Sequence, residues 1–360
     1  MASTYDLDKP SVSNVEENRT RLCEEFAAIT GTDSAVAQCY LAENEWEMER
    51  ALNSFFEADL EKVFEEDLIE SEPGPNTKKQ KVEERPPEEC IDLTEDSSAS
   101  AHKTSEEDES KLSLISWNVD GLDTDNLAER ARGLCSFLVL YTPDVVFLQE
   151  LIPPYVQYLK KRAVSYLIIE GGEDGYFTGM MLKKSRVKLI ESEIVAYPTT
   201  QMMRNLLVAQ VTFKDQKLCL MTSHLESCKG QAAERMKQLR VVMQRMREAR
   251  DDVTVLFGGD TNLRDAEVVK VGLPPSVCDL WERLGKQEHC RYTWDTKANS
   301  NKSVPYVSRC RFDRVYLRPA TKVGVPCIAP DHMALVGLEK LDCGRYTSDH
   351  WGIYCSFSLG

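Results

Sequence analysis

Several polar residues stand at the ends of short apolar runs in the last two thirds of the chain. They lie in the strings SWNVDGL, VFLQEL, MTSHLES, FGGDTNLRD, RFDRV and TSDHWG. A loop at the end of a buried strand is a rigid platform, so polar groups gathered on such loops are candidates for one shared site. The residues concerned are Asn118, Asp120, Glu150, His224, Asp260, Asn262, Asp313, Asp349 and His350.

This combination of carboxylates, amides and two histidines is the chemistry of magnesium acting on a phosphate substrate. A zinc site would need cysteines or a third histidine, and the set contains neither. Because Mg²⁺ prefers few carboxylates and several waters, we expect Glu150 to bind the ion directly and Asp120 and Asp349 to hold its waters. The few direct ligands favour one ion over two, and Mn²⁺ is the expected substitute.

The elements that must position these groups are short strands with few helices between them. Helices are expected at 128–140 and 231–250. Many strands of mixed spacing predict a four-layer α/β sandwich of two packed sheets flanked by helices. The absence of a GxGxxG string or a P-loop argues against a nucleotide-binding parallel sheet. The expected strands are 112–117, 145–148, 179–182, 206–213, 218–223, 253–258, 312–317 and 351–357.

Composition separates an acidic first part of the chain from a mildly basic second part. Residues 1–110 carry 10 Lys and Arg against 30 Asp and Glu, and residues 111–360 carry 34 against 29. A basic body is able to approach phosphates, whereas the acidic part is expected to meet proteins. The 12 cysteines include no CxxC pair, and neither a signal peptide nor a membrane-spanning stretch is recognisable. We therefore expect a monomer of the nucleus and cytoplasm without membrane contact.

Apolar residues recur at helical spacing over residues 17–60, which predicts a small bundle of three helices. The string FAAITGTDSAVAQCYLAENEWEMERALNSFFE resembles ubiquitin-associated domains, and the resemblance implies ubiquitin as a partner. A purely structural bundle is the alternative, because an amphipathic three-helix bundle is a common solution.

Residues 61–110 are rich in Glu, Asp, Ser and Pro and poor in aromatic residues, which predicts a disordered linker. Within it, the string CIDLTED around Ile91 and Leu93 resembles SUMO-interacting motifs, which add a strand to a sheet edge. Lys78, Lys79 and Lys81 are candidates for a nuclear address, although lysines in a solvated linker often have no such role.

The order WNV, QE, SHL, GDxN, FDR and SDH along residues 111–360 resembles the exonuclease-endonuclease-phosphatase superfamily of DNase I and the abasic-site endonucleases. The strings TGMMLKKSR, MMRNLL, YTWDTKANSN and LDCGRYTSDHWG are similar to its tyrosyl-DNA phosphodiesterase branch. This resemblance implies hydrolysis of 5′-phosphotyrosyl bonds between DNA and topoisomerase II remnants, leaving a 5′-phosphate.

The resemblance also implies roles for the polar set. Asp260, helped by Asn262, is expected to orient and deprotonate the attacking water. His350 is expected to bind a phosphoryl oxygen, with Asp313 accepting a hydrogen bond from its other nitrogen. Further donors to the phosphate are expected from Asn118 and His224.

The implied substrate is a single-stranded or frayed 5′ DNA end, which needs cations for the backbone and flat side chains for the bases. The expected contacts are Leu122, Tyr176, Arg204, Glu226, Ser227, Arg264, Trp294 and Phe312. An aromatic residue such as Trp294 or Phe312, taken alone, is more often a core residue, so its assignment as a DNA contact depends on the resemblance.

The sequence departs from the family pattern after the HLES string, where it has Cys228-Lys229-Gly230 in place of the expected Thr-Arg-Gly.

Two other readings remain open from sequence. Another superfamily branch, such as an abasic endonuclease, an RNA deadenylase or an inositol phosphatase, shares the same polar set. A ubiquitin- and SUMO-binding adaptor is the alternative from a different class. An adaptor with a silent catalytic domain predicts the loss of at least one catalytic group, and none is missing.

Overall fold

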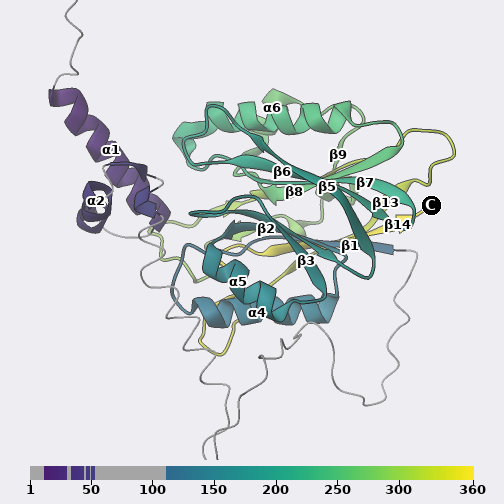
Figure 1. Ribbon diagram of the computed structural model, residues 1–360, viewed down its shortest axis with the longest axis horizontal. Helices are drawn as coiled ribbons and strands as arrows, with labels where there is room; N and C mark the ends of the chain where they lie inside the picture. Colours follow the sequence, from purple (N-terminus) through teal and green to yellow (C-terminus); the bar gives the residue numbers. More distant parts are fainter. Residues whose placement is uncertain (1–11, 31–33, 44–45, 49, 53–110) are drawn as a thin grey trace, which may run out of the picture.

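The computed structural model describes residues 12–30, 34–43, 46–48, 50–52 and 111–360. Residues 111–360 form two six-stranded mixed sheets that pack face to face, with helices on both outer faces (Figure 1). The four-layer α/β sandwich predicted from the sequence is therefore confirmed. The predicted linker at 61–110, with Ile91 and Leu93, lies outside the described residues.

The first sheet has the strand order β13-β14-β1-β2-β4-β3. Its centre is the parallel pair of β1 and β2, and antiparallel strands flank this pair on both sides. Two helices cover its outer face (Figure 1). The elements are β1 (Lys111–Asn118), α4 (Leu127–Tyr141), β2 (Val145–Leu151), α5 (Pro153–Arg162), β3 (Tyr166–Glu170), β4 (Phe177–Lys183), β13 (Ile328–Val336) and β14 (Gly352–Leu359).

The second sheet has the strand order β5-β6-β7-β8-β12-β9, again with one central parallel pair, β7 and β8. The long helix α6 covers its outer face (Figure 1). The elements are β5 (Val187–Ala196), β6 (Asn205–Phe213), β7 (Gln216–His224), α6 (Ala232–Glu248), β8 (Val253–Asp260), α7 (Asp265–Val271), β9 (Cys278–Asp279) and β12 (Asp313–Arg318). Shorter elements are η1 (Lys229–Gln231), α8 (Leu280–Arg283), η2 (Glu288–Cys290), β10 (Trp294–Asp295) and β11 (Arg309–Cys310).

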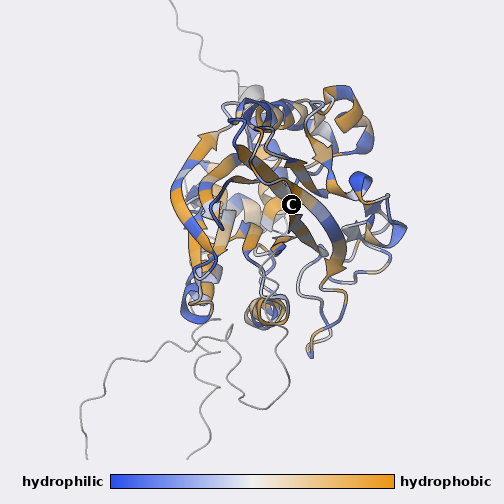
Figure 2. Ribbon diagram, turned by 90° about the vertical axis from the view of Figure 1, so that its right-hand side faces the viewer, coloured by the Kyte–Doolittle hydropathy of each residue, from blue (hydrophilic) through white to orange (hydrophobic). Residues whose placement is uncertain are grey.

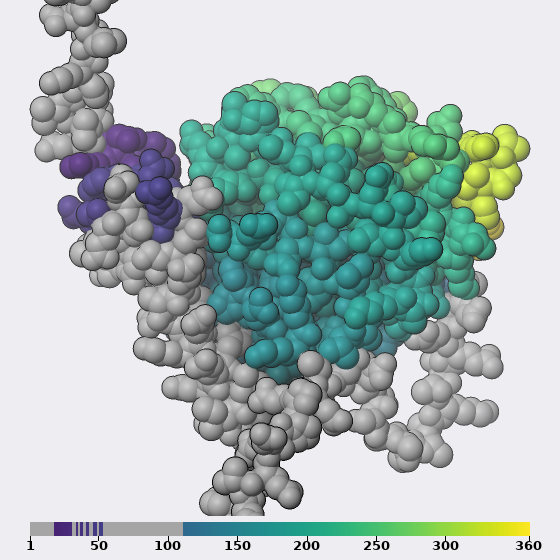
Figure 3. Space-filling model, viewed as in Figure 1, coloured from purple at the N-terminus to yellow at the C-terminus, as the bar shows by residue number. Residues whose placement is uncertain are grey.

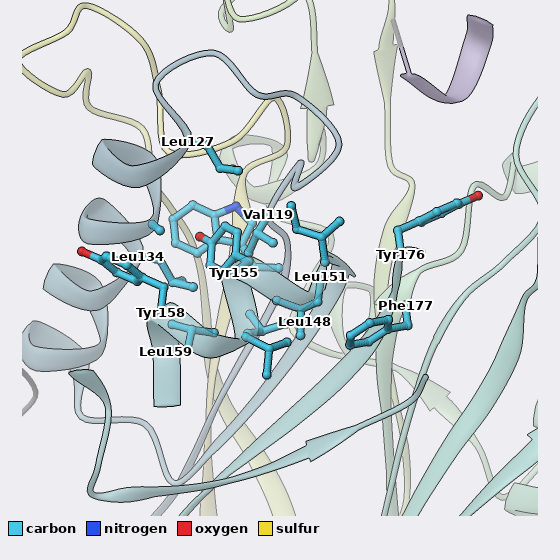
Figure 4. Packing of buried hydrophobic residues seen from close by; sticks show 14 of the residues in the cluster. Val119, Leu127, Leu134, Leu148, Leu151, Tyr155, Tyr158, Leu159, Tyr176 and Phe177 are labelled. Atoms are coloured by element: carbon cyan, nitrogen blue, oxygen red, sulfur yellow. The ribbon is translucent and has the colours of Figure 1, made fainter. Parts of the chain in front are cut away.

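Alternating strand residues build three apolar layers. Leu114, Phe147 and Leu220 belong to the layer between the sheets. Trp117 and Leu148, three and one residues along from Leu114 and Phe147, pack on the opposite face under α4 and α5 with the aromatic and leucine side chains seen in Figure 4. A third layer lies under α6. Figure 2 shows the same division, with apolar strands inside and hydrophilic residues on loops and outer helix faces.

The eight strands expected from the sequence correspond to β1, β2, β4, β6, β7, β8, β12 and β14. The sequence patterns did not predict the two-residue strands β9, β10 and β11, nor the longer strands β3, β5 and β13. Each of these three longer strands lies at the edge of a sheet. Edge strands have one side exposed and tolerate charged residues and proline. Five consecutive residues of β5 are exposed, and β13 has an irregularity beside Pro330, so neither has a clear apolar alternation.

In the N-terminal region the structure describes α1 (Val12–Thr30) and α2 (Ser34–Glu43), followed by helical residues around Ala51. Phe26, Leu41 and Leu52 are completely buried. The helices agree with the predicted bundle, although α1 begins before residue 17. Figure 3 shows the two helices in purple as a small lobe beside residues 111–360. Among the described residues, no helix is long and apolar enough to cross a membrane.

Candidate active site

Three predicted site residues form one row across the second sheet. His224 ends β7 and lies in register with Asp260, the last residue of β8. Asp313 begins β12 and lies opposite Asp260 on its other side. Residues in register on neighbouring strands point to the same face of a sheet and lie about 5 Å apart. The strand register therefore brings together groups that are far apart in the sequence.

Asn118 at the end of β1 connects this row to the first sheet. Its Nδ2 donates to Glu150 Oε1 at 2.9 Å and to Asp260 Oδ2 at 3.0 Å. Its Oδ1 accepts from the backbone nitrogen of Asp120 at 2.9 Å. The side-chain amide of Asn118 thus donates two hydrogen bonds and accepts one inside the site, and these three bonds fix its orientation.

Three of the site residues have a left-handed backbone conformation. The φ angles of Asp120, Glu150 and Asn262 are 51°, 58° and 51°. Each costs on the order of 1–2 kcal/mol for a residue with a Cβ, so the surrounding structure must hold these turns in place. Gly121 contributes, because a Cβ there would lie 2.1 Å from the carbonyl oxygen of Glu150. The strand ends turn sharply and direct their side chains into one cleft.

His350 is held by Asp313. Its Nδ1 and Asp313 Oδ2 are 2.8 Å apart, and its Nε2 lies 3.6 Å from Asp260 Oδ2. Burial favours the neutral imidazole, but the carboxylates of Asp313, Asp260 and Asp349 outweigh it and raise the pKa of His350 well above its usual value. His350 is therefore protonated near neutral pH and presents Nε2–H as a donor.

His224 has the opposite character. Arg204 Nη1 lies 2.9 Å from its Nδ1, and its Nε2 lies 3.4 Å from Asp260 Oδ2. Burial and the Arg204 guanidinium lower the pKa of His224 well below its usual value. A guanidinium can only donate, so Nδ1 accepts and Nε2 carries the proton. His224 is thus a neutral donor, whereas His350 is a cationic one.

Asp260 lies between the two imidazoles. Burial raises its pKa to about 7, even though the His350 charge acts in the opposite direction. Its Oδ1 accepts from the backbone nitrogen of Asn262 at 3.0 Å. A carboxylate with a pKa near neutrality can accept a proton from water and release it again, which suits the predicted general base.

The residues fit a divalent metal ion. Burial and the Asp349 charge raise the pKa of both Asp120 and Glu150, although Lys302 and Arg130 act on Asp120, and His350 and Arg204 on Glu150, in the opposite direction. The nearby cations therefore compensate these acids only in part. Asp120 Oδ2 is buried without a hydrogen-bond partner. Glu150, His224 and Asp260 form a group whose potential ligand atoms lie within 4.8 Å of one another. Because both nitrogens of His224 are in use, the two carboxylates are the candidate ligands of this group. Oxygen-rich sites with incompletely compensated carboxylates are typical of Mg²⁺ or Ca²⁺.

A second such group consists of Asp260, Asp313 and His350. The hydrogen bond between Asp313 and His350 already occupies one of its nitrogens, and protonation of the imidazole removes the other as a ligand. Asp120 and Asp349 belong to neither group. Their predicted role, holding metal-bound waters, does not require direct coordination and stays a prediction.

Lys302 is a site residue that the sequence reading missed. Its Nζ lies 3.1 Å from Asp120 Oδ1 and 2.9 Å from Asp123 Oδ2. Burial opposes the charge, but Asp120, Asp349 and Asp123 raise the pKa of Lys302, so the ammonium remains charged. No motif signals this role, because the lysine and its partners lie on loops distant in sequence. The Lys302 ammonium thus lies beside Asp120 and Asp349, the two carboxylates predicted to hold the metal-bound waters.

These groups open into a cleft with a volume of about 780 Å³. Leu122, Tyr176, Arg204 and Ser227, all predicted DNA contacts, line it. Cys228 also lines it and has a φ of 66°, so the departure from the expected string lies directly at the cleft. Residues of the last turns of α1, including Glu24 and Glu25, complete the rim.

Trp294, Phe312 and Arg264 extend the site on one side. The Trp294 and Phe312 rings are 5.8 Å apart, and the Arg264 guanidinium lies 5.3 Å from the Phe312 centroid. Trp294 Nε1 also donates to Asp349 Oδ2 at 3.2 Å. Phe312 is only 9% exposed, so the half-buried ring of Trp294 provides the accessible aromatic surface beside Asp349, and such a surface is suited to stacking of a nucleotide.

Two of the predicted DNA contacts need correction. Glu226 is completely buried and accepts hydrogen bonds from Thr200 and Gln238, so it supports the loop under the cleft and cannot reach DNA. Arg204 lines the cleft but is 8% exposed, and its terminal nitrogens contact His224 and Ser227. Its main role in this arrangement is to orient His224, because both terminal nitrogens are already engaged and its Nε is buried.

Two family models match the chain. The model of the Endonuclease/Exonuclease/phosphatase family matches residues 115–350, and that of the UBA-like domain matches residues 20–61. Among curated proteins, the chain is 65% identical to tyrosyl-DNA phosphodiesterase 2 of Danio rerio, over 96% of this chain and 100% of that protein. It is 53% identical to the Homo sapiens protein of the same name, over 95% and 93%.

Solved structures agree with this similarity. A D. rerio TDP2 structure complexed with single strand DNA product matches with a TM-score of 0.68 and 76% identity, covering 69% of this chain and 99% of that one. A Caenorhabditis elegans TDP2 structure covers 99% of this chain and 98% of its own at 25% identity, with a TM-score of 0.63. The similarity thus includes the N-terminal region as well as residues 111–360.

Proposed function

Because this chain belongs to the endonuclease/exonuclease/phosphatase family, and within it to the tyrosyl-DNA phosphodiesterase 2 proteins, we propose that it hydrolyses the bond between a tyrosine and a DNA 5′-phosphate. The reaction belongs to DNA repair and leaves a 5′-phosphate. One observation carries the proposal: Asp260 lies between one neutral and one protonated imidazole, beside an acidic, metal-compatible cleft. These groups provide a general base for water and hydrogen-bond donors for the phosphoryl oxygens, which is what hydrolysis of a phosphodiester requires.

The chemistry follows from the positions of the side chains. Ionised Asp260 takes a proton from water as the water oxygen attacks phosphorus, with Asn262 helping to orient it. His350 donates from Nε2 to a phosphoryl oxygen, and the donors Asn118 Nδ2 and His224 Nε2 lie beside it around Asp260 Oδ2. The bond from phosphorus to the tyrosine oxygen breaks, and its electron pair stays on that oxygen. A phenol has a pKa near 10, so the phenolate leaves without a strong general acid.

Glu150 is the residue that would bind Mg²⁺, with Asp120 and Asp349 turned toward its waters. When bound, the ion supplies positive charge to the phosphoryl oxygens, and Mn²⁺ is the expected substitute. The raised pKa of Glu150 and Asp120 supports this assignment, since the nearby cations do not offset the effects of burial and of the Asp349 charge. One ion is the proposed number.

The proposed nucleic-acid substrate is a single-stranded or frayed 5′ end. The cleft and the half-buried ring of Trp294, packed on Phe312, support this choice, because accessible aromatic faces bind unpaired bases without regard to their identity. The D. rerio relative was solved with single-strand DNA product. Leu122 and Tyr176 are proposed to contact the terminal nucleotides.

The proposed protein part of the substrate is a topoisomerase II remnant. The UBA-like domain supports ubiquitin as a further partner, which would recruit the enzyme to modified adducts. The SUMO-type string around Ile91 and Leu93 is a second candidate for recruitment. We propose a monomer that acts in the nucleus and cytoplasm.

The test is hydrolysis of a single-stranded oligonucleotide with a 5′-phosphotyrosine, with and without Mg²⁺. The wild type should release a 5′-phosphate end only with the ion. Asp260→Ala and Glu150→Ala should lower the rate by about 1,000-fold or more. Glu191→Ala, which removes an exposed carboxylate on β5, is the control and should leave the rate unchanged. If the wild type is inactive here but cleaves abasic or polyadenylate substrates, the branch assignment is wrong.

A further inference from the structure

Arg130 on α4 is completely buried, and its guanidinium donates to five main-chain carbonyl oxygens. Nε contacts Asp125 at 3.1 Å. Nη1 contacts Val119 and Thr347, both at 3.2 Å. Nη2 contacts Asp120 at 3.1 Å and also Asp123. A guanidinium has five N–H donors in a rigid fork, so every one of them is used.

The five acceptors come from two segments at opposite ends of the catalytic region. Four belong to the loop 119–125, which follows β1 and contains Asp120. The fifth is Thr347, two residues before Asp349 and three before His350. One side chain therefore ties together the two loops whose acids are proposed to face the metal.

These loops need such a tie. Asp120 has a φ of 51°, an unfavourable backbone conformation that the surroundings must stabilise. Hydrogen bonds from the fixed Arg130 guanidinium to the carbonyl oxygens of Val119 and Asp120 hold this turn in place.

We propose that Arg130 is a positioning residue of the active site, which holds the loop 119–125 against Thr347 so that Asp120 and Asp349 face the same divalent ion. This inference rests on the proposed metal-dependent function. Arg130 itself touches neither metal nor substrate. Mutation of residues that orient metal ligands without touching the metal typically weakens metal affinity by about 10- to 100-fold.

The fold has other contacts at the same place, so the role of Arg130 is separable from folding. Glu129 Oε1 accepts from the backbone nitrogen of Cys343 at 2.8 Å. Gly133 packs so closely that a Cβ would lie 2.9 Å from Leu341 and from Thr347 Oγ1. We therefore expect helix α4 to stay docked on the segment 341–347 when the guanidinium is changed.

The experiment compares the full chain with Arg130→Lys and Arg130→Gln. Lysine keeps the charge but offers three donors, and glutamine removes the charge. Arg132→Gln, two residues along the same helix and exposed, is the matched control. Mn²⁺ affinity is measured by calorimetry without DNA, and thermal unfolding is followed on the same samples. Activity is then titrated with Mg²⁺.

We expect both Arg130 variants to unfold cooperatively and to bind Mn²⁺ about 10- to 100-fold more weakly, with the Mg²⁺ half-saturation point of activity displaced in parallel. The control should bind as the wild type does. Unchanged affinity with a lowered unfolding temperature would overturn the inference, since Arg130 would then serve the fold alone. A lysine variant that does not fold would overturn it equally. If the wild type binds no Mn²⁺, the proposed metal dependence itself fails.

Discussion

Asp260 and Asp313 lie directly opposite each other on β8 and β12, yet only Asp313 hydrogen-bonds to His350. The two carboxylates therefore have different tasks. Asp313 Oδ2 accepts from Nδ1 at 2.8 Å and fixes the imidazole, whereas Asp260 faces Nε2 at 3.6 Å and remains able to bind water. Neighbouring titratable groups with different environments are a common basis for acid and base assignments.

The first prediction uses this pair. Asp260→Asn removes the base, so kcat should fall by about 1,000-fold or more while KM for the oligonucleotide changes little. Asp313→Asn keeps the base but removes the anionic partner of His350, so the pKa of His350 should fall and activity should be lost at lower pH than in the wild type. Steady-state kinetics from pH 5 to 10 checks both variants. Identical pH profiles for Asp313→Asn and wild type would contradict the assignment.

The second prediction is the pH profile of the wild type. Asp260 acts when ionised, and burial raises its pKa to about 7, so activity should increase as pH rises toward 7. His350 acts when protonated, and its raised pKa places the alkaline decline well above 6.5. A bell-shaped kcat/KM profile is expected. Bound Mg²⁺ favours the ionised acid, so the acidic midpoint should move lower as Mg²⁺ is increased. A midpoint independent of Mg²⁺ would argue against a shared electrostatic site.

The third prediction concerns Lys302. Its ammonium pairs with Asp120 and Asp123, so it competes for the acids that face the proposed ion. Lys302→Met should therefore strengthen Mn²⁺ binding, by about 10-fold for an effect near 1.4 kcal/mol. Calorimetry on the full chain measures this change. Lys297→Met is the control, because Lys297 is exposed in the same region. Equal or weaker binding by Lys302→Met would show that the lysine does not compete.

The fourth prediction separates two roles of Trp294. Its ring faces Phe312, and its Nε1 donates to Asp349. Trp294→Ala should raise KM for a single-stranded oligonucleotide by about 5- to 100-fold, since stacking is worth about 1–3 kcal/mol per base. Trp294→Phe keeps a stacking face and should recover most of this loss. If both variants weaken binding equally, the hydrogen bond to Asp349 matters more than stacking.

The fifth prediction concerns the close approach of β1 and β2. A Cβ at Gly121 would lie 2.1 Å from the Glu150 carbonyl oxygen, so Gly121→Ala must displace the turn that carries Glu150. We expect a loss of about 1–3 kcal/mol in the free energy of unfolding. Mn²⁺ affinity should fall as well. Gly230→Ala is the control, because nothing lies within 4 Å of its added Cβ. Denaturant unfolding and calorimetry measure the two effects, and equal behaviour of the two variants would refute the prediction.

The interior of the fold was readable from the sequence. Strands such as β1, β2 and β8 are buried on both faces, so their residues are mostly apolar or small and the strands end at polar residues. Those ends identified Asn118, Glu150 and Asp260 as site candidates. The edge strands β5 and β13 escaped detection because one exposed side relaxes the apolar pattern.

The sequence by itself determined which chemical groups are present and that they follow strand ends. Tertiary structure alone decided which of them meet: the row of His224, Asp260 and Asp313, the contact of Lys302 with Asp120, and the turn of Arg204 toward His224. It also decided that Glu226 is buried. The physical reason is that these contacts depend on strand register and on left-handed turns stabilised by distant neighbours, and neither is a property of local sequence.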